Sequence, residues 1–212
     1  MEDTDAIQRP AYDPPYESPL EDSFAWHTVK YLAPQVRFEK QVEVLTRWGV
    51  FRMDFVLDTG KRRVGLECDG KDFHDPWRDR RRDALILGTG VVGAIYRFPG
   101  SAVYHAPEAC LYGLAGFEPD GFSDRGRINL TQLASPWMRH HCDESRDRSG
   151  FEVLYEWKEG SLRDIVHRHH FEIAADRRNE LVDFFAWART RPERSLDALV
   201  AAYDDSWWGQ VI

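Results

Sequence analysis

Three carboxylate residues, Asp54, Glu67 and Asp69, stand on two stretches of sequence that are otherwise apolar. Side chains alternate along a strand, so Glu67 and Asp69 share one face of their stretch. If an even number of residues joins the two stretches, Asp54 lies on that face too, with opposed Cβ atoms about 5 Å apart. Like charges this close are costly unless a cation neutralises them. All-oxygen ligands favour Mg²⁺ or Mn²⁺, and such an ion activates water for phosphodiester hydrolysis.

Basic residues follow these acids directly and could act on a phosphate group. Lys71 or an arginine of the following segment could support a phosphate or the attacking water. Residues three and four apart share a helix face, so Arg78, Arg81 and Arg82 could line one side and contact a nucleic-acid backbone. The alternative is a solvated face whose arginines pair with neighbouring aspartates. Arg97 ends an apolar strand, where it could reach the acid cluster or pair with Asp83.

The elements that must position these residues form an α/β pattern. Ser18 as N-cap, Pro19 in the first turn and Glu21 three residues after the cap predict a first helix, ended by Pro34. Alternation and turn residues predict three strands, and Asp75–Pro76 start and glycines end the next helix. The predicted strands are 36–45, 50–57, 62–69 and 91–98, and 106–116 is a closing helix. The strands on either side of the helix at 76–87 are expected to pair in parallel within a mixed sheet flanked by helices.

Three regions are predicted along the chain. Residues 1–17 are acidic and proline-rich and read as a disordered leader, 18–117 form the core, and 118–212 form a C-terminal, helix-rich extension of unknown role. Within the extension, 120–132 resemble a loop, 151–157 and 170–175 resemble strands, and 177–189 and 195–203 resemble helices. The pattern leaves open whether this extension is a separate domain or packs on the core.

Composition narrows the function classes. The chain of 212 residues has 42% hydrophobic residues, a formal net charge of −8 and only three cysteines. The acidic balance argues mildly against broad nonspecific nucleic-acid binding, although the positive charge is clustered. Neither a membrane-spanning run nor a disulfide framework is predicted, and a reducing cytoplasm fits best. The histidines near Cys142 and at 167–170 match no common zinc spacing.

The motifs, taken in order, resemble the PD-(D/E)XK nuclease superfamily. The matching stretches are "SPLE", "RMDF", "LECDGKDFH" and "DRRRDALILGTGVVGAIYRF", which lie within residues 18–114. They look closest to restriction-endonuclease-like proteins related to the very-short-patch-repair endonuclease. The resemblance implies a restriction-endonuclease-like core and Mg²⁺-dependent cleavage of DNA phosphodiesters. It also implies that Asp54 and Glu67 are metal ligands.

The resemblance extends to further residues, with one departure. Asp69 falls where the superfamily most often has lysine, so that role is unassigned, and Lys71 is the candidate for it. His74 could act as a general base or contact the phosphate. Glu21 matches an acid that lies near the metal in similar proteins, and its alternative role is that of a capping-box residue. Among the arginines, Arg82 is favoured for a phosphate contact.

The sequence therefore predicts an Mg²⁺- or Mn²⁺-dependent endonuclease acting on DNA in repair or restriction-type defence, with Asp54, Glu67, Asp69 and Glu21 as ligands. The extension could provide target selection, a protein partner surface or a homodimer contact. One alternative is a catalytically inactive nuclease-like module that only binds nucleic acid. Another is a protein-interaction domain with its acids on the surface, which predicts no DNA binding at low salt.

Overall fold

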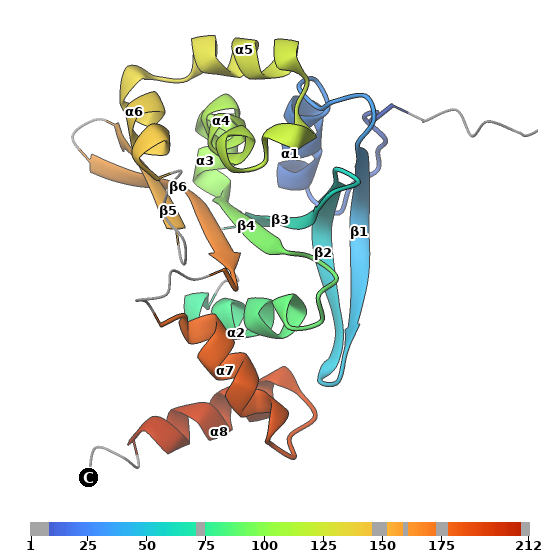
Figure 1. The fold of residues 1–212 in the computed structure, drawn as a ribbon, viewed down its shortest axis with the longest axis vertical. Coiled ribbons are helices and arrows are strands. Elements are labelled where there is room, and N and C mark those ends of the chain that lie inside the picture. Colours follow the sequence, from blue (N-terminus) through green and yellow to red (C-terminus); the bar gives the residue numbers. More distant parts are fainter. Residues whose placement is uncertain (1–8, 71–74, 146–151, 159–160, 173–177, 209–212) are drawn as a thin grey trace, which may run out of the picture.

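The chain forms a six-stranded mixed sheet with helices on both faces (Figure 1). This computed structural model describes residues 9–70, 75–145, 152–158, 161–172 and 178–208. The strands lie in the order β1-β2-β3-β4-β6-β5, and β3 pairs with β4 in parallel while the other neighbours are antiparallel. Their bounds are β1 Arg37–Thr46, β2 Gly49–Asp58, β3 Arg63–Asp69, β4 Ala94–Pro99, β5 Glu152–Lys158 and β6 Ser161–His170. The expected parallel pairing across the helical crossover is confirmed.

The larger hydrophobic core lies on one side of the sheet. It packs Phe55, Leu66 and Phe98 of the strands against Phe24 and Leu111 of the helices, all fully buried. The helices on this side are α1 Pro19–Thr28, α3 Gly100–His105, α4 Pro107–Phe117, the 3₁₀ turn η1 Pro119–Gly121, α5 Asp124–Leu133 and α6 Pro136–Ser145. The closing helix predicted at 106–116 is thus confirmed as α4.

The other side of the sheet is covered by α2 Pro76–Leu87, α7 Glu180–Arg189 and α8 Leu196–Trp208 (Figure 1). Val56 and Ile95 of the sheet pack there against Leu85 of α2, and Phe184 of α7 and Leu199 of α8 complete this second core. The C-terminal helices therefore lie against α2, the helix that follows β3, which carries Glu67 and Asp69.

Local sequence signals explain where the first two helices begin. The Ser18 side chain accepts a hydrogen bond from the Glu21 N–H, and the Asp75 side chain accepts from the amides of Trp77 and Arg78. Each cap satisfies backbone donors that a helix start leaves unpaired, and a proline follows each cap. The C-cap of α2 is Gly88, as predicted. Helix α1 ends at Thr28, short of Pro34.

The C-terminal extension contributes strands to the core sheet. β6 pairs with β4 from Ala94↔His170 to Arg97↔His167, and β5 pairs with β6. A strand was expected at 170–175, but β6 ends at His170 and residues 173–177 lie outside the described part. The expected strand at 151–157 and helices at 177–189 and 195–203 correspond to β5, α7 and α8.

Two expectations for segments without predicted structure are wrong. Most of the segment 120–132, expected as a loop, lies in α5, which begins at Asp124 because the Ser123 side chain caps the helix by accepting from the Gly126 N–H. The glycine, asparagine and aspartate content of this segment masked that cap. Part of the expected leader is also placed: Tyr12 and Tyr16 pack against the core, and Lys40 pairs with Asp13 at 3.0 Å. Residues 1–8 lie outside the described part.

Candidate functional site at the end of β3

The three acids singled out in the sequence lie on neighbouring strands: Asp54 on β2, and Glu67 and Asp69 at the end of β3. The β2–β3 loop spans residues 59–62, an even number, and the register continues to Phe55↔Leu66. Glu67 and Asp69 share the face of β3 that α2 covers, because Glu67 pairs with Arg82 of α2 and Asp69 shares Arg97 with Asp83 of α2. Continuing the β2–β3 register by one step would set Asp54 across from Glu67, and its place on that face stays a prediction.

Asp54 is held by a backbone group. Its Oδ2 accepts a hydrogen bond from the Cys68 N–H at 2.8 Å. Burial, followed by the charge of Glu67, raises the pKa of Asp54 to about 7, although the Cys68 hydrogen bond works in the opposite direction. Within the described part of the chain no lysine or arginine forms an ion pair with Asp54. The charge of Glu67 on β3 therefore acts on Asp54 of β2 at an energetic cost.

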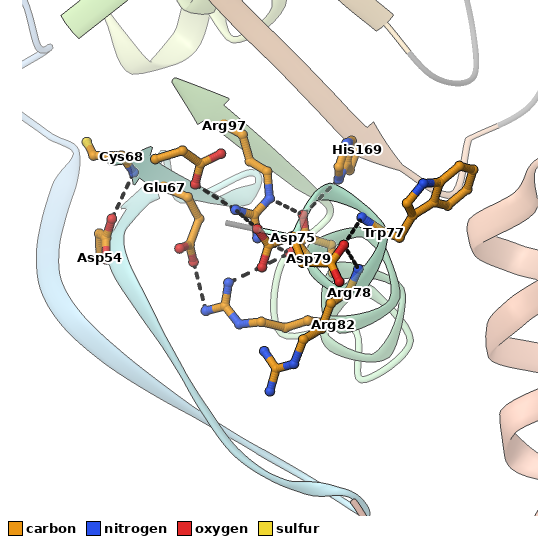
Figure 2. A network of polar contacts seen from close by, with 12 residues as sticks. Asp54, Glu67, Cys68, Asp75, Trp77, Arg78, Asp79, Arg82, Arg97 and His169 are labelled. Carbon is orange, nitrogen blue, oxygen red and sulfur yellow. Dashed lines mark hydrogen bonds and ion pairs between the residues drawn. The ribbon is translucent and has the colours of Figure 1, made fainter. Parts of the chain in front are cut away.

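Glu67 is buried and contacts an arginine of α2 (Figure 2). Its Oε1 accepts from Arg82 Nη2 at 3.0 Å, and Arg82 also donates to the Arg52 carbonyl. Burial raises the pKa of Glu67, and the charges of Arg82 and Arg97 oppose that rise. Arg82, which was expected to contact a phosphate, thus pairs with Glu67, an acid of the candidate site.

Asp69 belongs to a buried ionic network that crosses four elements. Arg97 of β4 donates from Nη1 to Asp69 at 2.7 Å and from Nε and Nη2 to Asp83 of α2 at 2.7 and 2.8 Å. His169 Nδ1 of β6 lies 2.7 Å from the same Asp83. Asp69 therefore points toward β4, on the other side of β3 from Asp54 and β2. Arg97 makes both contacts considered from the sequence.

The sequence analysis missed the central place of Asp83 and the role of His169. Asp83 is 0% exposed and His169 1% exposed. Burial alone would raise the pKa of Asp83, but Arg97 and His169 outweigh it and hold the pKa well below its ordinary value. The position of Asp83 directly before the buried apolar residues 84–87 was the sequence signal that could have indicated its burial. His169 gave none, because its contact depends on β6 joining the sheet beside β4.

Glu21 has the capping role that was considered for it, and its position near a metal stays a prediction. Its carboxylate accepts from Ser18 Oγ at 2.8 Å and from Gln41 Nε2 at 2.6 Å, and its backbone N–H completes the capping box. Its charge also contributes to the raised pKa of Asp54. Glu21 is thus a structural cap that lies within electrostatic reach of the candidate site.

The expectation that Arg78, Arg81 and Arg82 line one accessible side of the helix is wrong. Successive residues on a helix turn by about 100°, so Arg82 points to the sheet while Arg81 points to α7 and α8. Arg81 is only 7% exposed, and Arg78 pairs with Asp197 of α8 at 2.9 Å. Lys71 and His74 lie outside the described residues.

The carboxylates of the candidate site are the side chains that could bind a metal ion. Among the described residues, no group of three or more histidine, cysteine or acidic side chains is arranged to hold a metal, at the candidate site or among the histidines. Mg²⁺ is commonly bound by one or two carboxylates together with substrate phosphates and water. Asp54 and Glu67 are the two carboxylates that could meet that smaller requirement, and both Glu67 and Asp69 already accept a hydrogen bond from an arginine, Arg82 and Arg97 respectively.

A cavity of about 240 Å³ opens beside this network. It lies where β3 and β4 end, and Asp69, Arg97, Ser101 and His167 are among its lining residues. Parallel strands commonly present ligand sites at their carboxyl ends. Asp69 is therefore next to a space that a substrate group could enter.

Comparisons with protein-family models, with curated proteins and with solved structures gave no match to this chain. In the described part of the chain, no helix has both the length and the apolar character needed to cross a membrane.

Proposed function

We propose that this chain is a divalent-metal-dependent endonuclease that hydrolyses DNA phosphodiester bonds, with a PD-(D/E)XK-type site. The observation that carries the proposal is the pairing of Asp54 with Glu67. Both carboxylates are largely buried on neighbouring strands, burial raises the pKa of both, and the charge of Glu67 raises that of Asp54 further. A fold retains such a costly arrangement most readily when a cation is part of the working state.

Asp54 and Glu67 would hold Mg²⁺ or Mn²⁺, and Glu21 adds negative charge nearby. When bound, the metal would supply charge for the phosphate and a more acidic water. The Cys68 N–H fixes one carboxylate oxygen of Asp54, and the other, Oδ1, would be available as a ligand. Asp69, held by Arg97, would border the path of the substrate rather than serve as a primary ligand.

Arg82 would change partners during binding. Its pair with Glu67 neutralises that acid when no metal is present, and its side chain is mostly buried, at 14% exposed. In the substrate complex Arg82 would be the residue of α2 that contacts a phosphate oxygen of DNA. Arg82 thus keeps the role expected from the sequence, but only in the substrate complex.

A catalytically inactive nucleic-acid-binding module is the second candidate. One observation favours it: Arg82 and Arg97 already neutralise Glu67 and Asp69 without a metal. Under this alternative the acids and arginines form a permanent structural network. Asp54 weighs against it, because no described arginine pairs with that carboxylate and its hydrogen bond with the Cys68 N–H does not offset the rise in its pKa caused by burial and Glu67.

Cleavage of supercoiled plasmid and of short single- and double-stranded DNA, with Mg²⁺, Mn²⁺ or EDTA, tests the proposal. We expect metal-dependent cleavage that Glu67→Gln and Asp54→Asn each reduce by at least about 100-fold. Glu118→Gln is the matched control, because Glu118 is also a buried acid with a raised pKa but pairs with Tyr96 elsewhere in the fold.

Calorimetric titration with Mn²⁺ separates the two candidates. Heat that disappears in Asp54→Asn supports the enzyme. A silent titration, together with DNA binding and no cleavage, supports the inactive module. Equal cleavage by wild type and Glu67→Gln would assign the activity to a contaminant.

A further inference from the structure

Three of the four arginines of α2 are held by the C-terminal helices. Arg78 Nε pairs with Asp197 of α8 at 2.9 Å, and Arg80 Nη1 pairs with Glu180 of α7 at 2.8 Å. Both pairs are at least partly exposed, so each contributes little stability. Arg81, the third arginine held by the C-terminal helices, differs from the other two because its guanidinium is buried.

Arg81 lies among aromatic rings of both C-terminal helices. Its guanidinium carbon is 4.5 Å from the ring centre of Tyr203 in α8 and 4.9 Å from that of Phe184 in α7. The indole of Trp77 lies 5.8 Å away, on the first turn of α2 itself. Such contacts are strongest when they are desolvated, and Arg81 is only 7% exposed. The Arg81 contact therefore fixes α2 relative to α7 and α8.

This contact lies next in sequence to the residue that reaches the candidate site. Arg82 follows Arg81 and donates to Glu67 at 3.0 Å, and Asp83 binds Arg97. A rotation or shift of α2 would displace Arg82 and Asp83 together, since they share one rigid helix turn. Errors of about 1 Å in such placements cost catalysis up to about 100-fold.

We infer that Arg81 is a positioning residue and that α7 and α8 act as a buttress for α2 in the endonuclease reaction. This inference rests on the proposed function for its kinetic consequence. It assigns a role to the C-terminal extension: the two helices set the position of Arg82 at Glu67 without touching substrate themselves.

Two variant pairs test the inference in the full-length chain. Arg81→Met keeps the apolar stem and removes the cation, and Arg81→Lys keeps a cation near the rings. Tyr203→Leu removes the ring under the guanidinium, and Tyr203→Phe keeps it. Arg191→Met is the matched control, because Arg191 lies 5.0 Å from the Trp187 ring in the same C-terminal region. No described contact joins Arg191 to α2.

We expect Arg81→Met and Tyr203→Leu to lower kcat by about 10- to 100-fold, with KM for DNA unchanged within about twofold. Tyr203→Phe should retain wild-type kcat, Arg81→Lys should recover part of it, and Arg191→Met should match wild type. A lower melting temperature with unchanged kcat would make Arg81 only structural. A raised KM with unchanged kcat would make it a DNA contact. Either result overturns the inference.

Hydrogen exchange separates failure of the inference from failure of the proposed function. Arg81→Met should speed amide exchange in α2 in the absence of DNA, and Arg191→Met should leave it unchanged. If wild type does not cleave DNA, the proposed function fails and exchange alone decides the buttress. Unchanged exchange in α2 of Arg81→Met would then refute it.

Discussion

Replacing Asp83 with asparagine should destabilise the fold more than any single surface change. Asp83 is 0% exposed and accepts two hydrogen bonds from Arg97, and His169 is a second partner of its carboxylate. Asparagine keeps the volume but removes the negative charge and turns an amide donor toward other donors. Removing one partner of a buried ion pair costs about 3–5 kcal/mol, because the other charge remains buried without compensation.

Urea unfolding followed by circular dichroism measures this loss, and a double-mutant cycle isolates its cause. Asp83→Leu combined with Arg97→Met removes both charges, so the double variant should lose about 2 kcal/mol less than the sum of the two single variants. The reasoning is refuted if Asp83→Asn costs under about 1 kcal/mol, or if the two single effects simply add.

Two further perturbations have outcomes set by the structure. Burial and neighbouring arginines lower the pKa of His170 from 6.5 to about 3. The stability that depends on neutral His170 is therefore complete above pH 6.5 and is lost as the pH falls toward 3. Between pH 6.5 and 4.5, wild type should lose about 2 kcal/mol more unfolding free energy than His170→Leu, and equal losses in urea titrations would contradict this. A Cβ at Gly126 would meet the Tyr31 carbonyl oxygen at 2.3 Å, whereas one at Gly70 meets nothing within 4 Å. Gly126→Ala should therefore lower the unfolding free energy by about 1–3 kcal/mol, and a melting temperature no lower than that of Gly70→Ala would argue against the clash.

The sequence predicted the parts of the site that depend on local pattern. Alternation along β3 was sufficient to place Glu67 and Asp69 on one face, because the side-chain period of a strand is two. The start of α2 was also predictable, since Asp75 and Pro76 are adjacent cap and first-turn residues.

The partners of the acids could not be predicted, because they depend on contacts distant in sequence. Which arginine reaches Glu67 depends on the rotation of α2 over the sheet, and Arg81 and Arg82 have opposite roles although they are adjacent. His169 reaches Asp83 across 86 residues, and only because β6 pairs with β4. Helix α5 was missed because one serine cap outweighs a composition typical of loops.

The position of β6 between β4 and β5 has a consequence for synthesis of the chain. Strand β4 lies between β3 and β6 in the finished sheet, but β6 is made only when residues 161–170 leave the ribosome. Until then the β4 edge is open, and unpaired apolar edges promote aggregation. A nascent chain that ends near residue 117 also contains Asp83 and Arg97 without His169. The ionic network around Asp83 is thus completed late, once β6 has joined the sheet beside β4 and brought His169 to Asp83.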